Sequence, residues 1–231
     1  MTRMPIGDES DTCVVTCSSL EYFVRAAQKK GGTHFQVHVV DRNLHAEPER
    51  MKRTVGDVIR ALPARFRTVL VGMGFCGGAW DHAVFERRIV VPRADDCISI
   101  LLHKGDETEP ILKEPGHLYL YEPDPEQFSA LRLLRDPGTL GPEYEGMDRD
   151  TLFRYWFGNY HWMDIIDTGL TDCYDERYVE LAQENADRIG AGLGYAEGSN
   201  RMLEKLVSGR WDGQFVVAEP GQMIRHADFF G

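Results

Sequence analysis

Apolar, β-branched segments alternate with segments of helical spacing along most of this chain. In the first half, strands are predicted at residues 12–16, 35–40, 67–73, 88–91 and 117–121, and helices at residues 18–30, 48–62, 79–86 and 95–103. A strand that leads through a helix to the next strand forms a right-handed unit whose helix covers the sheet. This alternation therefore predicts an α/β fold built on parallel sheets.

A second alternating series follows a segment rich in proline and glycine. Its strands are predicted at 163–166, 192–196 and 214–218, and its helices at 174–189 and 200–208. We interpret the two series as Rossmann-like parallel-sheet lobes that share a cleft. The first lobe spans 1–121, a connecting region with one helix at 126–134 spans 122–160, and the second lobe spans 161–231. One continuous, mainly parallel sheet is the alternative.

Charge and hydropathy narrow the classes of partner. The chain has 231 residues and a formal net charge of -11, so its surface repels phosphate backbones and nucleic acid is not an expected partner. No apolar run approaches the roughly 20 residues of a membrane helix, and the first residues lack the apolar stretch of a secretory signal. We expect a cytoplasmic protein that acts on a small molecule, with no membrane partner.

The cysteines point to reduced thiols rather than to a disulfide framework. There are five of them, an odd number, and we expect a cytoplasmic chain. Reduced thiols serve as core filler, as metal ligands or as nucleophiles, so their positions must decide between these roles.

Four reactive residues follow the first four predicted strands, one after each strand. Cys17 follows strand 12–16, His45 follows 35–40, Cys76 follows 67–73 and Cys97 follows 88–91. Ligands of open parallel sheets bind at the carboxyl ends of the strands. Thiolates and imidazole are good ligands of zinc and related transition metals. The sequence therefore predicts one metal site at this edge, most simply zinc.

Three further side chains are candidates for orienting ligands at the same edge. Arg93 and Asp96 lie beside Cys97, and Asp167 ends a strand of the second series, where it would face the shared cleft and contact a bound cofactor or ligand. Simpler roles compete with these: free cysteine is often core filler, a histidine in a turn often serves as a cap, and an aspartate before a helix commonly caps it. The chain has no CxxC pair, no GxGxxG fingerprint and no Walker motif.

The same residues carry a family resemblance. The relevant segments are Cys17, Leu44-His45 with Pro48, Gly72-Met73-Gly74-Phe75-Cys76-Gly77, Pro92-Arg93-Ala94-Asp95-Asp96-Cys97, Ile166-Asp167-Thr168-Gly169-Leu170 and Gly209-Arg210-Trp211-Asp212. On these segments, residues 12–224 resemble the domain-of-unknown-function 1638 family of bacteria and archaea. The family usually has histidine where Asp95 stands.

The resemblance implies an association with corrinoid-dependent methyl transfer, and hence a corrinoid protein as partner. Combined with the thiol pattern, it leads us to expect a metal-dependent enzyme, a zinc-thiolate transferase that acts on a small molecule or on a corrinoid-bound methyl group. A zinc-bound thiolate stays deprotonated at neutral pH, as methyl transfer to sulfur requires. One alternative is a metal or corrinoid carrier without turnover. Another is a metal-free thiol enzyme with Cys76 as nucleophile and His45 as base.

Overall fold

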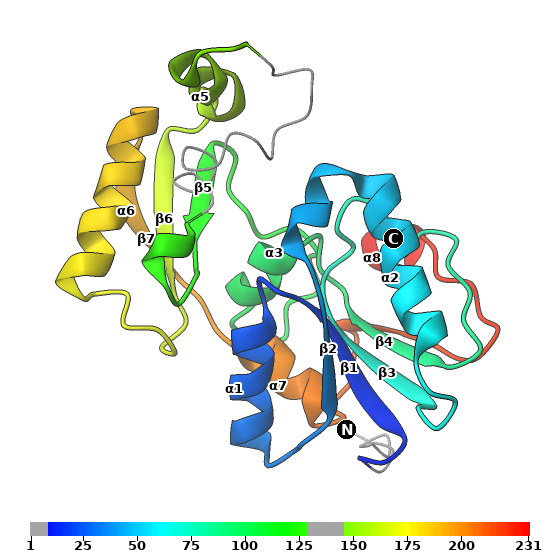
Figure 1. Ribbon diagram of the computed structural model, residues 1–231. Coiled ribbons are helices and arrows are strands. Elements are labelled where there is room, and N and C mark those ends of the chain that lie inside the picture. The colour runs from blue at the N-terminus through cyan, green and yellow to red at the C-terminus, as the bar shows by residue number, and fades with distance from the viewer. Residues whose placement is uncertain (1–8, 129–145) are drawn as a thin grey trace. The chain divides into compact units, whose positions relative to one another are not determined.

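The computed structural model describes residues 9–128 and 146–231, which form two compact units (Figure 1). The first unit is built from the chain up to Leu112 and from Ser199 onward, and the second from Lys113–Gly198. Each unit contains its own sheet, so the two expected parallel-sheet lobes are confirmed. None of the helices in these described ranges is long and apolar enough to cross a membrane.

The sheet of the first unit has five strands. They are β1 (Thr12–Cys17), β2 (Gln36–Val40), β3 (Thr68–Gly72), β4 (Arg88–Pro92) and β8 (Phe215–Ala218). Their spatial order is β2-β1-β3-β4-β8; the first four are parallel, and β8 runs antiparallel to β4. The chain thus leaves β1 to one side for β2 and returns to its other side for β3.

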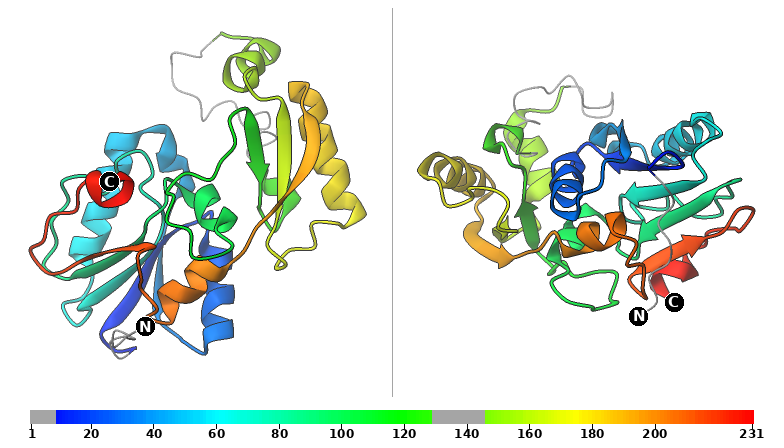
Figure 2. Two further views of the ribbon diagram at one scale, coloured as in Figure 1. Left: turned by 180° about the vertical axis from the view of Figure 1, so that it is seen from behind. Right: turned by 90° about the horizontal axis from the view of Figure 1, so that it is seen from below.

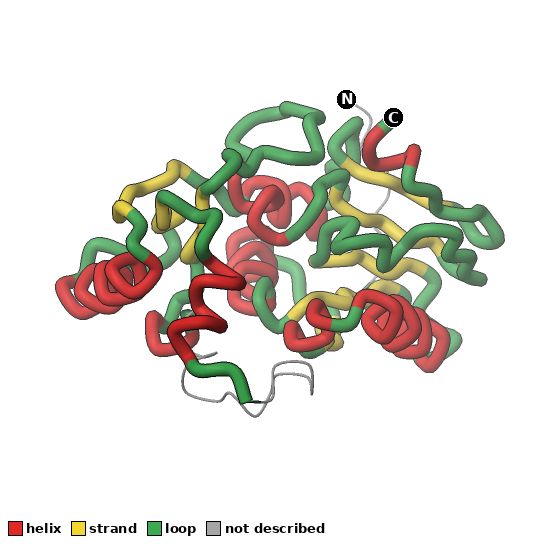
Figure 3. The backbone as a smooth tube through the Cα atoms, turned by 90° about the horizontal axis from the view of Figure 1, so that it is seen from above, coloured by secondary structure: helices red, strands yellow, loops and turns green. Residues whose placement is uncertain are grey.

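Helices cover both faces of this sheet (Figures 2 and 3). They are α1 (Glu21–Gly31), η1 (Arg42–Ala46), α2 (Pro48–Ala61), α3 (Cys97–Leu102), α7 (Arg201–Val207) and α8 (Ala227–Phe230). On one face, α1 and α7 lie side by side. On the other, Val55 and Ile59 of α2 share a core with Val15 of β1 and Val71 of β3. Burial on both faces explains why β1, β3 and β4 read as continuous apolar runs, whereas the edge strand β2 is largely exposed.

The second unit contains a smaller parallel sheet of order β5-β6-β7. Its elements are β5 (His117–Leu120), η2 (Pro125–Gln127), α5 (Arg149–Phe157), β6 (Trp162–Asp167), α6 (Glu176–Ile189) and β7 (Gly192–Glu197). Leu181 and Ala182 of α6 pack on Met163 and Ile165 of β6. The structure describes each unit by itself, so the shared cleft stays a prediction.

The units divide the chain at other points than the sequence suggested. β5 was expected at the end of the first lobe but pairs with β6 in the second unit. β8 was expected in the second lobe but returns, with α7, to pair with β4 in the first. Both differences have one physical reason: strand pairing over long sequence separation, which local patterns do not specify.

The expected helix at residues 79–86 is wrong. This segment forms turns, in which the Trp80 indole Nε1 donates to the Gly74 carbonyl oxygen at 2.8 Å and His82 adopts φ 61°. A left-handed residue and a buried indole bonded to a preceding turn are incompatible with a continuous helix. Of the helix expected at 126–134, residues 129–134 lie outside the described residues, and the described part contains the 3-10 turn η2. The helix α5 was not expected.

Gly72 should be required where β3 meets α1. A Cβ at this position would lie 2.5 Å from Thr16 Oγ1 and 2.8 Å from Val24 Cγ2, in a fully buried layer. We expect Gly72→Ala to lower the free energy of unfolding by about 1–3 kcal/mol, measured by urea denaturation. Gly31→Ala is the matched control, because its new Cβ meets nothing closer than 3.8 Å. Equal stability of the two variants would contradict this close packing.

Candidate thiol site

The strand order places a ligand-binding position at the carboxyl ends of β1 and β3. The strand order β2-β1-β3 reverses direction between β1 and β3, so the loops that follow these two strands part there. Such switch points are where open α/β sheets bind ligands. Cys17 is the last residue of β1, and Cys76 follows the end of β3 by four residues. The two cysteines therefore stand on the two strands that flank the switch point.

The loop that carries Cys76 is bonded to the loop that carries Cys97. The Phe75 N–H donates to the Ala94 carbonyl oxygen at 2.8 Å, and the Cys76 N–H donates to the Asp95 carbonyl oxygen at 2.7 Å. Gly74 allows this approach, because a Cβ there would lie 2.7 Å from the Ala94 oxygen. These main-chain bonds bring the third and fourth strand ends together.

Cys76 is buried near two other thiols and a carboxylate. Burial raises the pKa of its thiol well above the usual value, and the neighbouring Cys97, Asp96 and Cys17 raise that pKa further. A hydrogen bond with the Gly74 backbone acts in the opposite direction. The structure thus brings the three strand-end cysteines and Asp96 close enough to interact electrostatically.

The thiols of Cys17 and Cys97 have different surroundings. Cys17 is buried, and the Ser19 hydroxyl donates a hydrogen bond to its Sγ at 3.0 Å. Cys97 is half-buried and is the first residue of α3. Asp96 caps that helix by accepting from the Ser99 N–H at 2.9 Å. Asp96 thus has the capping role that is common for an aspartate before a helix, and this bond fixes the backbone next to Cys97.

Cys76 has a strained backbone. Its φ is 50°, in the left-handed region that costs a residue with a Cβ about 1–2 kcal/mol. Gly77 and Gly78, which follow, also have positive φ, without that cost. Outliers of this kind persist when the surroundings hold them, and they cluster at functional sites.

An aromatic segment near the carboxyl end of the chain packs against the Cys76 loop. The Phe75 ring lies 5.3 Å from the His226 ring, 4.9 Å from Phe229 and 5.2 Å from Phe230. The Ile224 carbonyl oxygen accepts from the His82 N–H, and the Ile224 N–H donates to Ala83, both at 2.9 Å. This segment, together with the bonds to the loop after β4, holds the strained turn from two sides.

His45 differs from the buried thiols in its exposure to solvent. Its side chain is exposed, and its Nδ1 is 2.8 Å from the Arg42 carbonyl oxygen. Its neighbour Leu44 packs on the core of the first unit. A role for His45 as a metal ligand stays a prediction.

Asp167 belongs to the second unit and organises its own loop. Its carboxylate accepts from the Tyr174 hydroxyl at 2.7 Å and from the Gly169 N–H at 2.9 Å. These two bonds, the phenol bond first, hold the pKa of Asp167 below its usual value. Its expected place in a cleft shared with the thiols stays a prediction.

One pair of titratable residues was missed from the sequence. His117 Nδ1 and Asp164 Oδ2 are 2.5 Å apart across β5 and β6, and Gly194 on β7 leaves space for the Asp164 carboxylate. The available signal was an aspartate in the middle of an otherwise apolar strand, because a buried carboxylate needs a partner.

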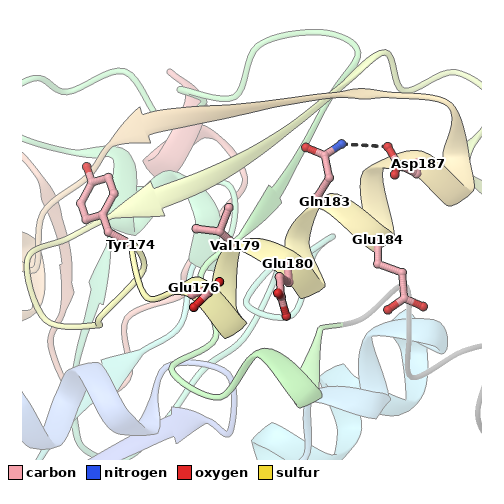
Figure 4. A pocket seen from close by; sticks show the side chains of 7 residues that line it. All are labelled: Tyr174, Glu176, Val179, Glu180, Gln183, Glu184 and Asp187. Carbon is pink, nitrogen blue, oxygen red and sulfur yellow. Dashed lines mark hydrogen bonds between the residues drawn. The ribbon is translucent and has the colours of Figure 1, made fainter.

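A pocket also lies along the exposed side of α6 (Figure 4). It is lined by Tyr174, Glu176, Val179, Glu180, Gln183, Glu184 and Asp187. Its polar side chains are mostly carboxylates from a single helix, and Gln183 is bonded to Asp187 at 2.8 Å. It contains none of the residues expected to carry chemistry.

The thiol site fits a thiophilic metal ion in its donor chemistry. Three thiols gather there, and a cation would offset the burial that opposes ionisation of Cys76. As placed, however, the described residues contain no group of three or more His, Cys, Asp or Glu side chains arranged to hold a metal ion. Metal binding at this site would require a different arrangement of its side chains.

The strain at Cys76 gives a stability test. We expect Cys76→Gly to be more stable than Cys76→Ala by about 1 kcal/mol, because both variants lose the thiol but only glycine adopts φ 50° freely. Urea denaturation measures both. At Cys17, in an extended strand, the order should reverse, with the alanine variant the more stable. An alanine variant at 76 as stable as the glycine variant would argue against the strain.

The comparisons with known proteins give a family and no activity. Residues 39–207 match the family described as "Protein of unknown function (DUF1638)". No curated protein and no solved structure matches the chain. The matched segment contains Cys76, Arg93 and Cys97, whereas Cys17 precedes it. It covers well over half of the chain, and the protein therefore belongs to the DUF1638 family.

Proposed function

We propose that the protein is a metal-dependent transferase in which Cys17, Cys76 and Cys97 hold a thiophilic transition metal, with zinc as the first candidate. The observation that carries the proposal is the burial of Cys76 beside two other thiols at the switch point of the sheet. Three sulfur donors select zinc and other borderline or soft ions over magnesium or calcium.

The surrounding residues would prepare the thiols for this role. Ser19 donates a hydrogen bond to Cys17 Sγ and so helps to orient that side chain. Asp96 fixes the first turn of α3 and with it the backbone of Cys97. When bound, the metal would supply the positive charge that keeps sulfur ionised at neutral pH. Burial alone acts in the opposite direction, because it favours the protonated thiol.

Methyl transfer to or from a small molecule or a corrinoid protein is the reaction we propose. Its support is the family resemblance together with a thiol-rich site at a ligand-binding edge. Two alternatives use the same residues. A carrier without turnover would favour a closed, four-ligand site, whereas catalysis needs an open position. A metal-free nucleophile at Cys76 is less favoured, because burial raises the pKa of its thiol and His45 is exposed.

Metal content tests the proposal. We expect reduced, tag-free protein to bind about one zinc ion per chain, and Cys76→Ser, Cys17→Ser and Cys97→Ser each to weaken binding by at least about tenfold. Elemental analysis after equilibrium dialysis measures the stoichiometry, and cobalt substitution adds a thiolate charge-transfer absorption. Less than about a tenth of an equivalent of any transition metal would overturn the proposal.

Matched variants separate the thiol site from general effects. Cys13→Ser and Cys173→Ser should keep full binding, because Cys13 is in the middle of the core and Cys173 is in the second unit. His45→Gln distinguishes the two kinds of site: loss of metal indicates a fourth protein ligand and a closed site, and retention indicates an open position.

Zinc affinity should rise with pH. Each thiol must lose a proton to bind, and the pKa of the Cys76 thiol is raised, so protons compete most strongly at low pH. We expect affinity to increase steadily between about pH 6 and about pH 8 in a competition assay with a chelator. A flat profile would show that thiolates are not the ligands.

A further inference from the structure

Arg93 stands where β4 reaches the thiol site. The strand ends at Pro92, and the Ala94 N–H closes a tight turn around Arg93 by donating to the Pro92 carbonyl oxygen at 2.9 Å. The Arg93 N–H is bonded to the Gln214 carbonyl oxygen at 2.7 Å, which fixes its main chain. Arg93 is therefore held in a defined place at the carboxyl edge of the sheet.

One donor of the Arg93 guanidinium lacks a hydrogen-bond partner among the residues that the structure describes. This donor, Nε, is buried without an acceptor. Two other arginines of the unit have an ion-pair partner: Arg88, at the opposite end of β4, is bonded to Glu219 at 2.9 Å, and Arg201, whose Nε is also buried without an acceptor, is bonded through Nη2 to Asp106 at 2.6 Å.

A buried arginine donor without an acceptor is unexpected in this protein. The chain carries a net charge of -11, so carboxylates outnumber cations on its surface. A buried donor without an acceptor costs free energy, and such groups in folded proteins call for an explanation. An oxyanion supplies the missing acceptors, because carboxylate and phosphate oxygens match the forked donors of a guanidinium.

The position of Arg93 links this anion to the thiols. The next two residues, Ala94 and Asp95, provide the carbonyl oxygens that bind the Phe75 and Cys76 N–H groups. A small molecule whose anionic group is bound by Arg93 would therefore lie beside the cysteine loop.

We infer that the substrate of the thiol site is a small oxyanion, a carboxylate or a phosphate ester, whose charged group is bound by the guanidinium of Arg93. This inference rests on the proposed function for the identity of the reacting groups. Binding of the anion itself needs no metal, so the two proposals can fail separately.

Two alkylating reagents test the inference in reduced, metal-stripped protein. Iodoacetate is an anion and iodoacetamide is its neutral analogue, and the half-buried Cys97 reports on both. Site-resolved mass spectrometry gives the ratio of the two alkylation rates. We expect Arg93→Gln to lower the iodoacetate-to-iodoacetamide ratio at Cys97 by about tenfold, because the charge that concentrates the anion is lost. Arg93→Lys should retain part of the preference, since it keeps the charge without the fork.

Controls exclude a general effect of charge or folding. Arg88→Gln removes a cation from the other end of the same strand and should leave the ratio at Cys97 unchanged. Cys173, in the second unit, should keep its ratio in every variant.

A measurement on the unaltered protein does not depend on any variant folding. Inorganic phosphate or acetate should protect Cys97 from iodoacetate in a saturable manner, and the more effective anion identifies the phosphate or the carboxylate class. Equal ratios in the unaltered protein and in Arg93→Gln, or the absence of protection by both anions, would overturn the inference. Loss of metal binding alone would instead overturn only the proposed function.

Discussion

The hydrogen bonds between the loops after β3 and β4 are the constraint on which the rest of the site depends. They join Phe75 to Ala94 and Cys76 to Asp95, and they require the missing side chain of Gly74. Without these bonds, Cys76 and Cys97 would follow two neighbouring strands but would not have to approach one another. With them, Cys76 is held against the start of α3 and beside Arg93, so the thiols and the buried arginine donor share one edge.

Burial then sets the chemistry of this edge. A thiol in a desolvated position stays protonated unless a positive charge offsets the desolvation, and the pKa of Cys76 is raised accordingly. Its strained φ adds a cost of about 1–2 kcal/mol that the aromatic contacts of Phe75 and the loop bonds must outweigh. A core cysteine that serves only as filler needs neither the strain nor the neighbouring thiols, as Cys13 illustrates: it lies inside β1, and burial raises the pKa of its thiol to about 12.

The sequence predicted what depends on local pattern. The α/β class, the strand-end positions of Cys17, Cys76 and Cys97, and a capping aspartate before α3 all follow from alternation and spacing, and the structure agrees. The sequence did not predict features that depend on contacts between residues far apart along the chain. The membership of β5 and β8 is decided by pairing with β6 and β4. The turns around Trp80 replace a helix because the indole bonds to Gly74 and because Val84 forms an antiparallel bridge with Met223, far along the chain. The exposure of His45 depends in the same way on the packing of η1.

The two sheets differ in the property that creates a binding crevice. In the first unit the order β2-β1-β3 reverses the direction of the chain at β1, so adjacent loops part and leave room at the strand ends. In the second unit the order β5-β6-β7 follows the chain in one direction, and it contains no such reversal. The strand-end side chains behave accordingly. Asp167 of β6 is satisfied within its own loop by Tyr174 and Gly169, whereas Arg93, at the end of β4, has a buried donor that its surroundings leave without an acceptor. In the first unit, a buried donor without an acceptor therefore lies at the same edge of the sheet as the thiols.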